Sequence, residues 1–418
     1  MKYILSFIFI GISFLIFGQK GWEKDLAVAE AYMQQHAYQQ AVNYYNLSLQ
    51  VNETKEGLSN LGEAHFQLRE YKEALLTWTK LEQSFGVSGL IKLNLARAEF
   101  YLGHYQNALN QVQGIEDSAL TRQAKLIVSS CDSIKSWEKM NVTTRVRNMR
   151  VVNTSASEIA PVQYDNQLVF SSDRQGVLIK RNYEQTGNRF YDLYLSKKNL
   201  KNRWEKPVLF SAGINSANHE GAASFNLEGD EIYFTRSEFT QSENRNHSDE
   251  NRLKLYKSEL KNGRWSKPLW FMMNDSLHSF GHPCISEDGS YFFFVADLPN
   301  GFGGTDIYLS LKITDSTWSE PINLGASVNT SENELYPYFS PSEELYFSSN
   351  GLAGYGAYDL YQTTFRNGKW RTPSNLGKGI NSSYDEFSLT LLNPQKGVFS
   401  SNRPGGKGRE DLYLFLFE

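Results

Sequence analysis

The sequence predicts an α + β multidomain protein, in which an N-terminal α-helical solenoid is followed by a C-terminal β-propeller. Two observations predict this fold class: helix-forming segments recur every 33 to 34 residues in the first third, and an aromatic strand motif recurs five times after residue 144. A short apolar run opens the chain. The apolar period changes from helical to alternating near residue 144, so the repeats belong to separate domains. We therefore expect a signal peptide at 1–18, a helical domain at 22–140 and a propeller at 144–418.

The first residues predict export. A short basic start, Met1-Lys2-Tyr3, precedes an apolar run from Ile4 to Phe17. This run is shorter than the ~20 residues that span a bilayer, and it has the length of a secretory signal. We expect cleavage near Gln19 and a periplasmic protein, associated with the outer membrane through partners. An uncleaved N-terminal anchor is the alternative.

Composition excludes several classes of function. The formal net charge of −4 does not suit a protein that neutralises phosphates, so nucleic acid is not an expected partner. The two cysteines, Cys131 and Cys284, do not form a disulfide framework. The chain has no second apolar run of membrane-spanning length, and no direct membrane span is expected.

The helical repeats share one pattern of aromatic and small residues. Segments 28–38, 61–71 and 95–105 align without gaps, and each ends on a tyrosine that is followed three residues later by alanine. The tyrosine–alanine pairs are Tyr38/Ala41, Tyr71/Ala74 and Tyr105/Ala108. This pattern resembles the tetratricopeptide repeat. We expect three repeats, with a helix at 117–139 that caps the stack.

The resemblance implies a concave groove, lined by the first helix of each repeat, that binds a partner segment. The groove positions that we expect to contact a partner are Glu30, Gln34, Glu63, Gln67, Arg97 and Tyr101. Met33, Phe66 and Phe100 share these faces, and the alternative for them is packing between helices.

The C-terminal repeats are five copies of a strand–turn–strand unit. The first strand of each copy centres on an aromatic residue, and these are Phe170, Phe234, Phe294, Phe347 and Phe399. Four copies continue to a tryptophan with a proline three residues later, as in Trp204 and Pro207. Copies of about 55 residues with this content predict propeller blades. Five blades are expected; six are the alternative if the insert at Glu238–Arg252, which reads as a polar loop, hides further strands.

The set of five motifs resembles the WD-like repeat of the TolB-type propeller. The fifth copy lacks a tryptophan strand, and the alternating stretch Thr144–Val151 could pair with it and close the ring. Helical repeats joined to this propeller resemble proteins of Gram-negative envelopes, including a type IX secretion component, in which an OmpA-like domain follows. That domain is missing here, so peptidoglycan binding is not expected.

Glycine-rich turns, such as 350–356 within LYFSSNGLAGYGAYDLY, raise the question of a phosphate site. Similar turns recur at 300–306 and 403–411, each before a strand rather than a helix, so we interpret them as structural, with glycine supplying positive φ. The aspartates that follow the turns, Asp192, Asp306, Asp359 and Asp411, are expected to hydrogen-bond there rather than to form a metal ring.

No catalytic, cofactor or metal residue is predicted. His278, His282 and Cys284 fall within seven residues and are of types that bind zinc; the alternative is a buried cysteine beside two unrelated histidines. The function we expect is that of a non-catalytic envelope scaffold or adaptor whose partners are envelope proteins. The alternative is a glycan- or peptide-binding module or an enzyme that acts at the propeller mouth.

Overall fold

The computed structural model of the chain describes residues 21–113, 115, 118–139, 144–175, 189–240 and 250–417. These residues fall into two compact units, one formed by the described residues up to Ile127 and the other by those from Val128 onward. The predicted signal peptide lies outside the described residues.

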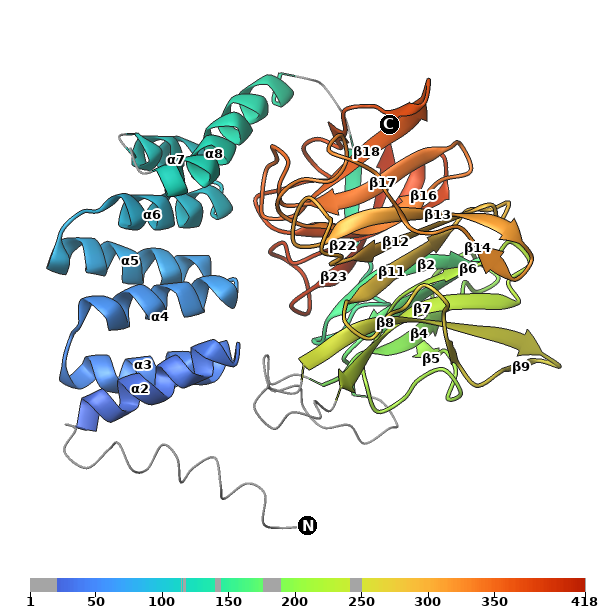
Figure 1. Cartoon of the computed structure of the whole chain (residues 1–418), viewed down its shortest axis with the longest axis horizontal. Helices are drawn as coiled ribbons and strands as arrows, with labels where there is room; N and C mark the ends of the chain where they lie inside the picture. The colour runs from blue at the N-terminus through green and yellow to red at the C-terminus, as the bar shows by residue number, and fades with distance from the viewer. Residues whose placement is uncertain are drawn as a thin grey trace, which may run out of the picture. The chain divides into compact units, whose positions relative to one another are not determined.

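Seven helices precede the strands in the described part of the chain (Figure 1). They are α2 (Gly21–Gln34), α3 (Tyr38–Val51), α4 (Lys55–Gln67), α5 (Tyr71–Phe85), α6 (Gly89–Tyr101), α7 (Tyr105–Val112) and α8 (Ser118–Trp137). Helices α2/α3, α4/α5 and α6/α7 are the three predicted repeats, and α8 is the predicted fourth element. None of these helices is long and apolar enough to cross a membrane.

The repeated small residues allow the two helices of a pair to approach closely. Ala29, Ala41, Ala74, Ala96 and Ala108 are all fully buried. In the second repeat the small residue is Gly62, where a Cβ atom would lie 2.2 Å from Nε1 of Trp78. The first repeat has the smaller Tyr45 at the position of Trp78, and it tolerates alanine. A glycine therefore accompanies the largest side chain in the stack.

The strands form five sheets arranged as the blades of a propeller (Figure 1). Blade 1 contains β2 (Glu158–Tyr164), β3 (Gln167–Ser172), β4 (Asp192–Ser196) and β5 (Val208–Leu209); blade 2 contains β6 (Glu220–Phe225), β7 (Glu231–Thr240), β8 (Glu250–Lys261), β9 (Arg264–Trp265) and β10 (Leu269–Trp270). Blade 3 contains β11 (Phe280–Ile285), β12 (Tyr291–Ala296), β13 (Asp306–Thr314), β14 (Thr317–Trp318) and β15 (Ile322–Asn323). Blade 4 contains β16 (Glu334–Phe339), β17 (Glu344–Ser349), β18 (Asp359–Arg366), β19 (Lys369–Trp370) and β20 (Ser374–Asn375); blade 5 contains β21 (Glu386–Asn393), β22 (Lys396–Ser401), β23 (Asp411–Phe417) and β1 (Thr144–Asn148).

Blade 5 confirms that the ring is closed by a strand from before the first repeat. Strand β1 pairs antiparallel with β23, in a register that joins Thr144 to Phe417 and Asn148 to Tyr413. Just past β1, the N–H of Met149 donates to the carbonyl oxygen of Leu412 at 3.0 Å. Without β1, β23 would be an exposed edge.

The five-blade prediction is confirmed, but the prediction of a loop at Glu238–Arg252 is wrong at both ends of that segment. Strands β7 and β8 continue into it as a hairpin, with Glu238 opposite Arg252 and Thr240 opposite Glu250. Backbone pairing therefore extends into residues whose polar composition indicated a loop; residues 241–249 lie outside the described residues.

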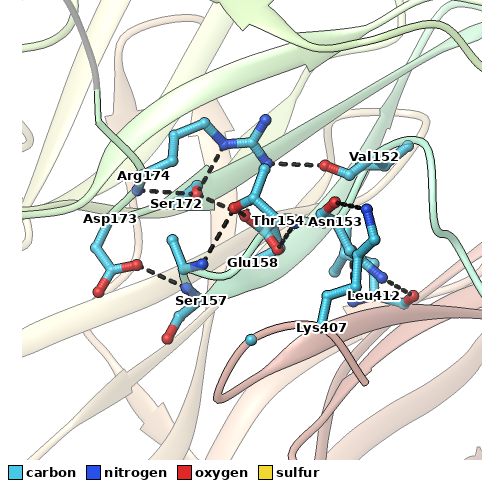
Figure 2. Close-up of polar contacts among 12 residues, drawn as sticks. Val152, Asn153, Thr154, Ser157, Glu158, Ser172, Asp173, Arg174, Lys407 and Leu412 are labelled. Atoms are coloured by element: carbon cyan, nitrogen blue, oxygen red, sulfur yellow. Dashed lines mark hydrogen bonds and ion pairs between the residues drawn. The ribbon is translucent and has the colours of Figure 1, made fainter. Parts of the chain in front are cut away.

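At each junction between blades, the side chain of one asparagine makes two hydrogen bonds to the backbone of a single residue in the preceding blade. Its Oδ1 accepts from the N–H of that residue, and its Nδ2 donates to the carbonyl oxygen of that residue. The five asparagines and their partners are Asn153–Leu412, Asn215–Leu193, Asn274–Leu255, Asn329–Ile307 and Asn381–Leu360. Figure 2 shows the first of these junctions.

Beside this asparagine lies a buried carboxylate whose hydrogen bonds are all made within the blade. Glu158 accepts hydrogen bonds from the N–H and hydroxyl of Thr154, from Ser172 and from Arg174, all at 2.7–3.0 Å (Figure 2). Similar ion pairs join Glu220 to Arg236 and Glu386 to Arg403. Because these charges pair with each other, they hold the loops rather than offering reactive groups.

Candidate functional site

The predicted groove residues lie on α2, α4 and α6, the first helix of each repeat. Glu63, Gln67, Arg97 and Tyr101 gather around Phe66 on α4 and α6, and we call these five residues the groove cluster. Successive first helices are neighbours in the stack, so side chains one repeat apart can meet.

An ion pair between repeats forms the polar part of the groove cluster. Nη1 of Arg97 lies 3.4 Å from Oε2 of Glu63, and Oε1 of Glu63 accepts a hydrogen bond from Gln67 at 2.7 Å. The guanidinium also donates to Oδ1 of Asn94 at 3.2 Å and lies 4.0 Å from the ring centroid of Phe66. Both charged side chains keep partial exposure, 22% for Arg97 and 31% for Glu63. Arg97 is thus held in one orientation while remaining accessible.

Aromatic rings form the apolar part of the groove cluster. The ring of Tyr101 lies 5.4 Å from that of Phe66 and 5.0 Å from that of Tyr71. Phe66 is partly buried and packs against the core of its repeat. Of the other two apolar groove positions, Phe100 is buried and Met33 packs against the first repeat's core. These contacts agree with the packing alternative for both residues.

The α2 residues contribute differently. Glu30 is half-buried, and burial, together with the nearby charge of Glu56, raises the pKa of its carboxyl. Gln34 is exposed. The contacts that join the groove cluster do not include either residue. Sequence reasoning missed Asn94, a buried polar residue of α6 that accepts a hydrogen bond from Arg97 and so orients it.

The other candidate location is the propeller axis, where the five inner strands β2, β6, β11, β16 and β21 meet. Each strand contains a bulge, and at the bulge Ala160, His282, Tyr336 and Ser388 adopt positive φ of 50–53°. These residues line a cavity of only about 40 Å³. Ligand pockets usually measure ~300–1,000 Å³, so side chains nearly fill this axis.

Two stacked rings occupy part of the axis. The rings of His282 and Tyr336 lie 3.8 Å apart with an interplanar angle of 12°, and the N–H of Tyr336 donates to Nδ1 of His282 at 3.3 Å. Burial lowers the pKa of His282 to about 3, so the imidazole is neutral at physiological pH. This neutral state suits Nδ1, which must stay unprotonated to accept the hydrogen bond.

The histidines and cysteine that raised the question of zinc have separate partners. Nδ1 of His278 lies 2.7 Å from Oδ2 of Asp275, while Sγ of Cys284 accepts a hydrogen bond from the N–H of Phe339 at 3.2 Å. Burial raises the pKa of the Cys284 thiol to about 12. In the part of the chain that the structure describes, no three His, Cys, Asp or Glu side chains are placed to hold a metal ion.

The aspartates that follow the glycine-rich turns form hydrogen bonds with the backbone of those turns. Asp306, Asp359 and Asp411 each accept hydrogen bonds from two backbone N–H groups of their own turn. The prediction that glycine supplies positive φ is wrong for Gly303, Gly356 and Gly408, which lie outside that region; Gly405 does adopt φ 88°. At these three glycines a Cβ would lie 1.6–2.1 Å from a carbonyl oxygen of the following loop. Close approach between blades explains them.

Comparison with known proteins gives no match to a family model or to a curated protein. Among solved structures, yeast Tom70 is 16% identical over 29% of this chain and 26% of its own, with a TM-score of 0.26. A puromycin-hydrolyzing peptidase of Mycobacterium tuberculosis is 13% identical over 64% of this chain and 46% of its own, with a TM-score of 0.37. An α-L-arabinofuranosidase of Lactobacillus brevis is 11% identical over 65% of this chain and 94% of its own, with a TM-score of 0.39. The chain thus spans about a quarter of Tom70 and about half of the peptidase.

Proposed function

We propose that this protein is a non-catalytic adaptor of the cell envelope, which binds partner proteins through the helical repeats. The observation that carries the proposal is the groove cluster. It presents a guanidinium that Glu63, Asn94 and Phe66 hold in place but leave partly exposed. Such preorganised arginine beside aromatic rings is typical of energetically important positions in protein interfaces.

The propeller supports an adaptor more than an enzyme or a glycan-binding module. The repeated aspartates accept hydrogen bonds from the backbone of their own turns, and the buried glutamates form ion pairs with arginines of the same blade. The cavity at the propeller axis measures only about 40 Å³. The envelope location rests on the apolar start of the chain and on the resemblance to helical-repeat and propeller proteins of Gram-negative envelopes. A link to secretion or outer-membrane machinery is part of this proposal.

A charge exchange within the groove cluster tests the proposal. The double variant Glu63→Lys/Arg97→Glu retains an ion pair between the repeats but reverses the charge that a partner meets. Because partly exposed pairs contribute ~0–1 kcal/mol to folding, the melting temperature should stay near that of wild type. Misplaced charges at an interface cost several kcal/mol, so capture of partners by cross-linking in envelope extract should fall roughly a hundredfold.

The matched control exchanges another ion pair in the same unit. Lys80 on α5 pairs with Glu53 away from the groove cluster, so Glu53→Lys/Lys80→Glu should leave capture unchanged. A folded Glu63→Lys/Arg97→Glu variant that captures every partner at wild-type yield would refute the groove as the binding site.

A further inference from the structure

An apolar hollow with a volume of about 650 Å³ lies between blades 3 and 4 of the propeller. It lies over Leu324, and Phe293, Phe339 and Trp370 line it. The rings of Phe293 and Phe339 are 5.0 Å apart, and those of Phe293 and Trp370 are 6.2 Å apart. We call this hollow the blade 3–4 groove.

The other blade junctions show what this space can hold. Phe210, Phe271 and Leu324 are structurally equivalent, since the N–H of each donates to the third strand of its blade, at Leu193, Leu255 and Ile307 respectively. The first two junctions are filled by a ring from the chain itself. Phe210 lies 5.7 Å from Trp265 and Phe271 lies 6.3 Å from Trp318, by ring centroids. Leucine replaces the phenyl ring at the third junction, as Leu324, and at the fourth, as Leu376. Leu376 packs against the cluster that contains Phe415, whereas the hollow lies at the third junction.

The rim of the groove is apolar where other blades carry charge. The cross-strand pair Tyr291 and Leu311 corresponds in register to Glu231 and Glu259 of blade 2. Tyr291 and Leu311 are each 38% exposed. An architectural need would apply to every blade, so the exposed apolar pair of blade 3 is not required by the fold.

A second rim position is also apolar. Phe365 pairs with Trp370, as Leu260 pairs with Trp265 in blade 2, whereas Lys198 and Lys312 pair with the corresponding tryptophans of blades 1 and 3. Phe365 is 50% exposed, and its ring lies 5.2 Å from that of Trp370. The fold accepts lysine or leucine at this position, so it does not require the exposed ring of Phe365.

The charges at the rim favour an uncharged occupant. The residues that line the groove are all described, and among them Glu343 and Lys369 carry opposite charges that balance. A polyanion or an acidic glycan would gain little there, whereas an apolar segment would bury aromatic surface.

We propose that the blade 3–4 groove binds an extended, uncharged segment of a partner protein, which inserts an aromatic side chain over Leu324. That side chain would take the place that Phe210 and Phe271 take in the first two junctions. The inference rests on the proposed adaptor function in taking the occupant to be a protein, and it places a second contact site on the propeller.

The test uses the full chain and a phage-displayed library of random short peptides. We expect panning to select peptides that share one aromatic residue flanked by uncharged residues. Leu324→Phe should fill the groove with the ring that blades 1 and 2 carry, and should weaken the selected peptides about tenfold or more without lowering the melting temperature. The matched control is Leu376→Phe, since the N–H of Leu376 marks the equivalent position of blade 4.

A rim variant keeps the test decisive if Leu324→Phe fails to fold. Phe365→Lys introduces the residue of blades 1 and 3, and it should weaken the same peptides, whereas Leu260→Lys at the equivalent position of blade 2 should not. Selected peptides without a shared aromatic, or peptides that bind both groove variants as they bind wild type, would overturn the inference. A wild-type dimer that Phe365→Lys dissociates would also overturn it, because a second copy would be the occupant.

The outcome is separate from that of the adaptor proposal. Peptide binding that depends on the blade 3–4 groove would stand even if envelope cross-linking found no partner. Conversely, partners captured through the groove cluster would stand even if panning selected nothing.

Discussion

At the scale of single residues, the propeller depends on glycines for a reason that composition does not reveal. Gly356 lies where a Cβ atom would approach the carbonyl oxygen of Tyr384 to 2.1 Å. Asn381 holds the loop that contains Tyr384 to the preceding blade through two hydrogen bonds, so the two loops cannot easily move apart. A Cβ atom at residue 356 therefore has to displace backbone atoms.

Gly356→Ala should therefore destabilise the propeller by about 2–3 kcal/mol. Chemical denaturation of the full chain measures the change in the free energy of unfolding. Gly213→Ala is the control, because its Cβ would make an ordinary contact at 3.5 Å and the glycine has no positive φ. Equal effects of the two substitutions would contradict the close-approach explanation.

His282 gives a second prediction at this scale, for the dependence of stability on pH. In the unfolded chain a histidine binds a proton near pH 6.5, but in the folded protein the pKa of His282 is about 3. Between these values the unfolded state binds more protons, so stability falls as the pH falls from 6.5 towards 3. The full shift would give about 2 kcal/mol at pH 5, and the partial exposure of the His282 side chain reduces this to about 1–2 kcal/mol.

The measurement compares urea unfolding at pH 7 and pH 5 for wild type and His282→Phe. The phenyl ring retains stacking on Tyr336 but does not titrate, so wild type should lose more stability than the variant. Carboxylates contribute equally to both proteins, and identical losses would show that His282 is protonated in the folded state.

At the scale of elements, closure by β1 is the feature with the clearest consequence for stability. Met149 and Val152, which follow β1, are 6% and 0% exposed, and both belong to the apolar cluster shared by blades 5 and 1. Loss of β1 and this segment would uncover that cluster and leave β23 as an edge strand.

We predict that a propeller fragment beginning at Asn153 aggregates or lacks a cooperative melt, while one beginning at Asn141 melts cooperatively. Calorimetry and size-exclusion chromatography measure the difference. If both fragments melt alike, the pairing of Thr144–Asn148 with β23 contributes nothing to closure.

At the scale of the whole molecule, the repeats made most of the fold predictable. The five strands that centre on aromatic residues such as Phe170 predicted the number of blades, and the alternating stretch Thr144–Val151 predicted the strand that pairs with β23. The Tyr38, Tyr71 and Tyr105 spacing likewise indicated the helix pairs, because a repeated unit shows its packing requirements several times over.

The sites were less predictable, since they depend on differences between repeats. The sequence shows that Leu324 is smaller than Phe210 and Phe271. It does not show whether the residues around Leu324 fill the volume that a phenyl ring would occupy, because that depends on packing. The pairing of Glu63 with Arg97 depends on how successive helices stack, which the residue types alone do not give. The six positions predicted for the helical groove remain predictions as contacts with a partner.

Export is the prediction that concerns the chain as a whole. Expressed in a Gram-negative host, the protein should reach the periplasm with an N-terminus at or near Gln19, because the run from Ile4 to Phe17 has the length of a signal segment. Fractionation followed by N-terminal sequencing measures this. Intact Met1 in the membrane fraction would instead indicate an anchor.

Closure of the ring also determines when β1 can pair with its partner strand during synthesis of the chain. Asn148 of β1 bonds Asp411, a residue 263 positions later. At ~5–20 residues per second, β1 leaves the ribosome roughly 13–50 s before its partner strand exists. Throughout that interval it is an unpaired strand, and the exposed Arg145 and Arg147 on its outer face discourage pairing with other chains. The first strand of the ring to be synthesised is thus the last to gain its hydrogen-bonded neighbour, and two arginines oppose aggregation through it in the meantime.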